Sequence, residues 1–169
     1  MPGLGEDYDL SIGVAPSDLS SAASTGKRIY MSELESVDVV LIKGAGTAGD
    51  DPTVTLVASS AATGGTSANL ATIGSYHLKD ATALAGTETW AKKTQIAAAT
   101  IADPGGAGTS AEHQQIAVIH VRAEDMPEGK PYLSLNIADV GTNAQLGAVL
   151  YITHPTIKEE PASLPPPLR

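Results

Sequence analysis

The side chains best suited to metal binding or proton transfer are the four histidines, because the 169-residue chain has no cysteine. They stand at His77, His113, His120 and His154, without the short spacing of zinc motifs. His120 falls inside a predicted strand and His154 at the end of one. A fold could still bring some of them together, but we expect hydrogen-bonded or exposed histidines and predict no metal site.

Other catalytic and nucleotide-binding patterns are incomplete. Ser24 to Arg28 lacks the upstream glycine and the Ser or Thr after lysine that a phosphate-binding loop requires. The chain has no G-x-S-x-G elbow. Asp50 and Asp51 are adjacent and precede a proline, which favours an Asx-type turn over the alternating oxygens of a calcium loop. We therefore predict a protein that is not an enzyme and needs no cofactor.

Trp90 is the only tryptophan, in a chain that has no phenylalanine. It could form a stacking platform for a sugar, but a large aromatic among small residues is better interpreted as an anchor in the core or at a subunit interface. An alanine-rich core of small side chains also favours oligomerisation, since subunit contacts would add to a modest hydrophobic stabilisation.

The charge balance bears on the class of partner. A formal charge of −9, with ten scattered basic residues, argues against nucleic-acid binding, which requires clustered Lys and Arg. The sequence shows neither the charged and apolar regions typical of a signal peptide nor a run of about 20 apolar residues, so we expect neither a signal peptide nor a transmembrane helix. We expect a soluble protein that binds neither nucleic acid nor a membrane.

The elements that must position these residues are organised around the stretch 37–60. Val37, Val39 and Leu41 are spaced two residues apart, and so are Val54 and Leu56. This period-2 spacing places each set on one face of a half-buried strand. We interpret the stretch as a β-hairpin. Its connection is longer than the two-residue hairpin turn, and the glycines and aspartates in it predict a projecting loop that could contact a partner.

The rest of the chain contains further short strand patterns. They are predicted at 9–14, 27–32, 70–79, 87–93, 116–121, 131–137 and 147–153, while 95–102 could be a helical turn or a strand. About eight or nine strands with little helix predict an all-β domain, a β-sandwich or jelly roll, with a barrel as the second choice. We divide the chain into an N-terminal arm (1–8), a β-sandwich domain (9–154) and an extended proline-rich tail (155–169).

Three segments carry a resemblance to a known family. They are 11–34, which includes GKRIYM, 39–53, VVLIKGAGTAGDDPT, and 138–151, ADVGTNAQLGAVLY. Together they resemble small head-associated structural proteins of tailed bacteriophages. The resemblance implies a capsid decoration, or cement, protein: a β-rich homotrimer on the outer surface of the virion, assembled in the host cytoplasm and bound to the major capsid protein.

On this hypothesis the candidate interface residues lie in the projecting loop, in the later polar connector and in the tail. They are Gly44, Gly46, Thr47, Gly49, Asp50, Asp51, Trp90, Asn143, Gln145, Pro165, Pro166 and Pro167. One alternative is a phage tail or adsorption protein with a carbohydrate-binding β-sandwich, in which Trp90 with Tyr76 or Tyr132 would form the platform. A second is a small jelly-roll hydrolase, which would require histidine and acid side chains that converge in a pocket.

Overall fold

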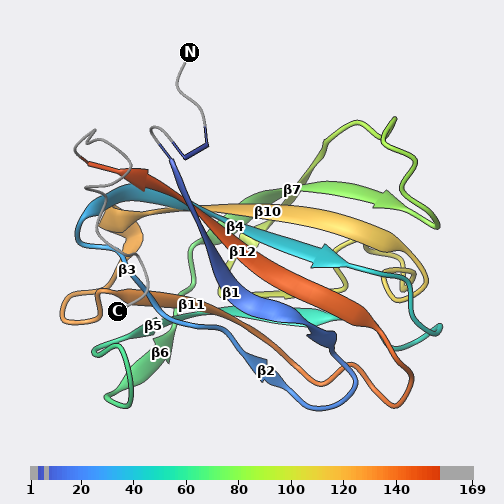
Figure 1. Cartoon of the computed structure of the whole chain (residues 1–169), viewed down its shortest axis with the longest axis horizontal. Helices are drawn as coiled ribbons and strands as arrows, with labels where there is room; N and C mark the ends of the chain where they lie inside the picture. Colours follow the sequence, from blue (N-terminus) through green and yellow to red (C-terminus); the bar gives the residue numbers. More distant parts are fainter. Residues whose placement is uncertain (1–3, 6–7, 157–169) are drawn as a thin grey trace.

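The computed structural model describes residues 4–5 and 8–156 and confirms an all-β, sandwich-like domain of two antiparallel sheets (Figure 1). The larger sheet has six strands, in the order β1 (Asp9–Asp18), β12 (Leu146–Pro155), β4 (Leu34–Lys43), β10 (Gln114–Arg122), β7 (Ile73–Ala81) and β8 (Ala91–Ala98). The smaller sheet is built on β11 (Tyr132–Ile137) and β5 (Thr53–Ser59), with the short strands β2 (Ser24–Thr25), β3 (Ile29–Tyr30), β6 (Ser67–Asn69) and β9 (Thr100–Ala102).

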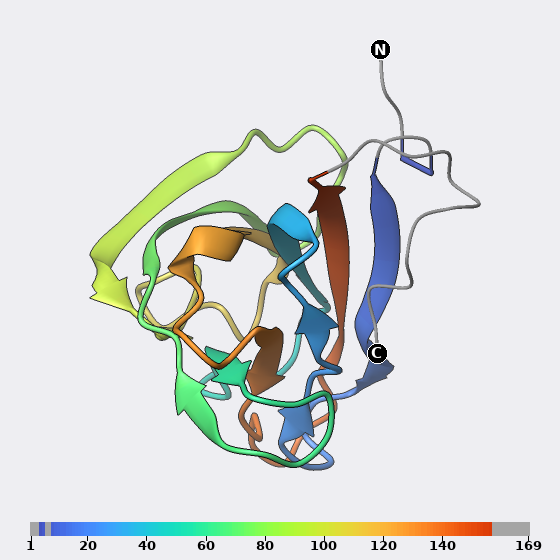
Figure 2. The same ribbon diagram turned by 90° about the vertical axis from the view of Figure 1, so that its left-hand side faces the viewer.

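The two sheets enclose one interior, which Figure 2 shows from one end of the molecule. No hydrogen-bonded strand pair joins the two sheets among the described residues, so they form a sandwich and not a closed barrel. A three-residue 3₁₀ helix, η1 (Ala123–Asp125), follows β10. Within the described ranges, no helix is both long and apolar enough to cross a membrane.

The predicted hairpin at 37–60 is wrong, although its strands and their buried faces are right. Val37, Val39 and Leu41 are buried on β4, and Val54 and Leu56 are buried on β5. However, β4 pairs with β10 and β12 in the larger sheet, whereas β5 pairs with β11, β6 and β9 in the smaller one. The loop after β4 is long enough to cross between the sheets, so both apolar faces point into the same interior.

Several strand boundaries also differ from the prediction. β1 continues beyond the predicted end at residue 14 to Asp18, through Pro16, because it is an edge strand with register shifts, where a missing backbone N–H is tolerated. β2 and β6 form outside all of the predicted strands. The stretch 95–102 is extended in β8 and β9, and Trp90 precedes β8 instead of lying within it.

The core is aliphatic, as the composition predicted, and Tyr151 is its largest fully buried side chain. Tyr151 projects from β12 towards the smaller sheet, where its hydroxyl donates to the Lys27 carbonyl oxygen (3.0 Å) and accepts the Leu135 N–H (3.1 Å). Burial raises the pKa of Tyr151 to about 12, and the hydrogen bond from Leu135 acts in the opposite direction. This one side chain therefore ties the two sheets together by polar as well as apolar contacts.

Candidate functional site

The loops after β4 and before β12 meet at one end of the sandwich, and the predicted interface residues of both loops come together there. The Gly44 N–H donates to the Leu146 carbonyl oxygen (2.7 Å). Asp50 lies against Gly141, where a Cβ would come within 2.3 Å of Asp50 Oδ1. The exposed residues are Thr47, Gly49 and Asn143, the half-buried ones are Gly44, Gly46, Asp50 and Asp51, and Gln145 is fully buried. We call the surface formed by residues 44–52, 103–113 and 138–145 the loop end.

A buried lysine stabilises the loop end through hydrogen bonds. Lys43, the last residue of β4, is only 2% exposed. Its Nζ donates to the carbonyl oxygens of Ser110, Ala111 (3.4 Å) and His113 (2.5 Å). Gln145 Nε2 donates to the same Ala111 oxygen (3.3 Å). A single cation thus fixes the segment before β10 to the end of β4 and, through Ala111, to the loop before β12.

Carboxylates surround this lysine without pairing with it directly. Asp51 Oδ1 accepts the Ala111 N–H (2.8 Å), and Asp80 accepts Gln115 Nε2 (2.9 Å). Burial lowers the pKa of Lys43 to about 8, while the negative charges of Asp80, Asp51 and Glu112 act to raise it. The network is a structural support for the loops, because Lys43 is almost completely buried.

We expect the free energy of unfolding to rise with pH between about pH 8 and pH 10, because the pKa of Lys43 is about 8 when folded and 10.5 for an ordinary lysine. In this interval the unfolded chain binds more protons than the folded chain, so a higher pH favours folding. The raised pKa values of Tyr76 and Tyr151 give stability that is lost only above the ordinary tyrosine value of 10. Urea denaturation across the interval measures the effect, and a steadily falling midpoint would contradict it.

Trp90 lies outside both the core and the loop end. It is 49% exposed beside the edge strand β8, and Lys79 Nζ lies 5.0 Å from its ring centroid. Tyr76 is buried, and its hydroxyl donates to Pro104 (2.8 Å). Tyr132 lies on the smaller sheet against another tyrosine ring. The predicted sugar platform is therefore not assembled. Of the two positions expected for Trp90, the core is contradicted by its exposure, and the subunit interface stays a prediction.

The predicted interface residues of the tail, Pro165, Pro166 and Pro167, lie outside the described residues.

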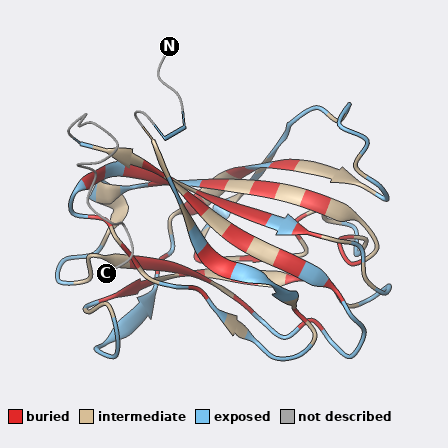
Figure 3. Ribbon diagram, viewed as in Figure 1, coloured by how far each residue is buried: buried red, intermediate tan, exposed pale blue. Residues whose placement is uncertain are grey.

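The sequence reasoning missed an apolar surface on the side of the larger sheet that faces away from the core. It carries aliphatic side chains on four adjacent strands, in register across the sheet. They are Leu10 and Ile12 on β1, Ala148, Leu150 and Ile152 on β12, Val40 and Ile42 on β4, and Ile116 and Val118 on β10. We call these nine residues the outer apolar face. Figure 3 shows the bands of buried and half-buried residues that alternate along β10 and β12.

Two of the four histidines meet at one margin of this face, as hydrogen-bonded residues. His120 Nδ1 lies 2.8 Å from Asp38 Oδ1, and His154 Nε2 lies 3.0 Å from Asp38 Oδ2. Asp38 is opposite His120 in the pairing of β4 with β10, and this register is not visible in the sequence. No group of three or more histidine and acid side chains in the described part of the chain could hold a metal ion.

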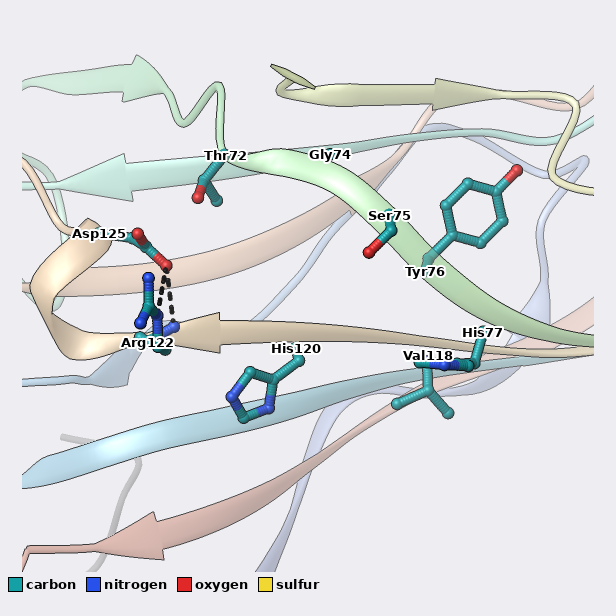
Figure 4. Close-up of a pocket in the computed structure, with 9 residues that line it drawn as sticks. All are labelled: Thr72, Gly74, Ser75, Tyr76, His77, Val118, His120, Arg122 and Asp125. Carbon is teal, nitrogen blue, oxygen red and sulfur yellow. Dashed lines mark hydrogen bonds and ion pairs between the residues drawn. The ribbon is translucent and has the colours of Figure 1, made fainter. Parts of the chain in front are cut away.

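His120 also lines a cleft of about 320 Å³ where β7 diverges from the end of β10 (Figure 4). His77, Arg122 and Asp125 line it too, and Asp125 lies within ion-pair distance of Arg122. Ser75 is on the opposite side of the cleft, but no hydrogen bond joins it to His120 among the described residues. The cleft thus contains histidine and acid side chains, but Asp38, the acid bonded to His120, does not line it.

Comparisons with protein-family models, curated proteins and solved structures found no match for this chain.

Proposed function

We propose that this protein is a structural virion protein that decorates the outside of a tailed-phage head and bridges capsomers of the major capsid protein. The observation that supports this most directly is the loop end, where three loops are held together through the buried Lys43. A surface that is ordered before binding loses little conformational entropy when it docks. The resemblance of the sequence to head-associated proteins supplies the proposed partner.

The proposed mechanism is mechanical. Each copy would be added in the host cytoplasm and would increase the contact area between capsomers against the outward pressure of packaged DNA. The exposed residues Thr47, Gly49 and Asn143 are small or polar, so each loop end would add a contact of moderate strength. Linking copies in a trimer, as the resemblance implies, would raise the overall affinity through effective concentration.

The test is binding to mature heads that lack decoration, followed by sedimentation of the heads with bound protein. We expect saturable binding by the wild-type protein, and a loss of affinity of at least about 10-fold for Thr47→Arg, since a bulky charge would project from the loop end. Thr63→Arg is the matched control, because Thr63 is also an exposed threonine and lies in the glycine-containing loop at the opposite end of β5.

Wild-type protein that does not bind to the heads would contradict the proposed function. Equal binding by the two arginine variants would show that the loop end is not the attachment surface.

A further inference from the structure

The central strands of the larger sheet have apolar residues on both faces. On β4, Val39 and Leu41 point into the core, while Val40 and Ile42 belong to the outer apolar face. β10 and β12 follow the same pattern. A sheet with one face in water normally alternates apolar with polar residues, and apolar residues on both faces are typical of sheets covered on both sides. The described chain covers only one of these faces.

The outward side of the sheet differs from the rest of the chain in charge as well. The row through Leu10 and Ile152 continues to Asp38 and His120. The rows through Val40 and Ile42 continue across β10 to His77 and Lys79 on β7. The chain has 19 acidic residues, but Asp38 is the only carboxylate in the paired rows of β12, β4 and β10. Each oxygen of the Asp38 carboxylate lies beside a histidine. Two copies of an acidic protein can approach here without bringing many carboxylates together.

We propose that the outer apolar face is buried against a second copy of this chain. The five strands β1, β12, β4, β10 and β7 lie about 4.8 Å apart and are up to about ten residues long, at about 3.3 Å each, which gives a face of roughly 800 Å². A standard protein interface buries about 800 Å² on each partner, with an apolar centre and a polar rim. The outer apolar face would be the centre, and Asp38, His120, His154, His77 and Lys79 would form the rim.

The orientation of the outer apolar face relative to the loop end is also compatible with contact to a neighbouring copy. The loops of the loop end leave the ends of the strands, whereas the outer apolar face extends along them (Figure 1). The two surfaces therefore face in different directions, and a copy attached through its loop end keeps the sheet face free for the copy beside it. The self-association itself does not depend on the proposed attachment to a shell.

The experiment is a mass measurement of the full chain in solution, by sedimentation equilibrium over a range of concentrations. We expect an oligomer for the wild-type protein, and at least about a 100-fold weaker association for Ile42→Lys and for Ile12→Lys. Both residues are more than a third exposed, at 39% and 45%, so lysine is compatible with the folded monomer. Ile96→Lys is the matched control, since Ile96 is a 94% exposed isoleucine on β8, outside the outer apolar face. Far-UV circular dichroism checks the fold of each variant.

A monomeric wild-type protein would overturn the inference and would leave the face to the shell or to another segment of the chain. An oligomer that Ile42→Lys and Ile12→Lys leave intact would also overturn it. If the wild-type protein forms an oligomer that these variants dissociate but does not bind heads, the inference holds and the proposed function fails. Loss of head binding by Ile42→Lys from a monomeric wild type would assign the face to the shell.

Discussion

Replacing Lys43 with methionine should lower the free energy of unfolding by about 3 kcal/mol. Methionine has a similar length, so packing changes little, but the Ser110 and His113 carbonyl oxygens lose the donor that Lys43 supplies. An unsatisfied buried polar group costs about 1–3 kcal/mol. Asp51 and Asp80 would also lose a nearby positive charge. Methionine avoids the burial of a charge, which offsets part of this loss.

Urea denaturation measures this change, with Lys93→Met as the matched control. Lys93 donates to a single carbonyl oxygen, that of Gly105 (2.8 Å), in a partly buried position, so its loss should be below about 1 kcal/mol. A Lys43 variant as stable as this control would show that the lysine does not hold the loop end together. The rise in stability between pH 8 and pH 10 should also be absent in Lys43→Met.

Replacing Gly26 with alanine should lower the free energy of unfolding by about 3 kcal/mol, the upper part of the range for overpacked cores. A Cβ at Gly26 would lie 2.3 Å from the Leu135 carbonyl oxygen and 3.1 Å from the Tyr151 hydroxyl. The Leu135 oxygen belongs to the backbone of β11, which pairs with β5 along its length and cannot easily move. Relief of the clash would therefore disturb the contact by which Tyr151 joins the two sheets.

Gly74→Ala is the control for this substitution. Gly74 lies in β7, a Cβ there would meet no atom within 4 Å, and its backbone does not require a positive φ. We expect a change within about 0.5 kcal/mol for this variant, as for other surface substitutions. Thermal unfolding of both variants measures the difference, and equal midpoints would mean that β2 can shift away from β11.

The period-2 pattern predicted much of the local structure. The alternation at Val37, Val39 and Leu41 correctly predicted which face of β4 is buried, because successive side chains of a strand point to opposite sides. The same pattern does not determine which strands pair. The sequence suggested that β4 pairs with β5, but β4 lies between β10 and β12, which come from the last third of the chain.

In the candidate site, too, the local structure was predicted from the sequence and the long-range contacts were not. Glycines and aspartates in residues 44–51 predicted a projecting loop, since these residue types favour turns. Nothing near Lys43 in the sequence indicated its burial, which depends on carbonyl groups of residues 110–113. The approach of His120 and His154 to Asp38 likewise depends on strand register across the sheet.

The sequence by itself determined an all-β domain with an aliphatic core, and the apolar alternation along each strand, because these follow from local residue types and from spacing within a strand. The tertiary structure alone decided that β4 and β5 belong to different sheets and that a buried lysine supports the loop end. It also decided that one apolar side of β4, β10 and β12 lies on the surface. Each of these three features depends on contacts between segments that are distant in the sequence. Such contacts are determined by the packing of the whole chain.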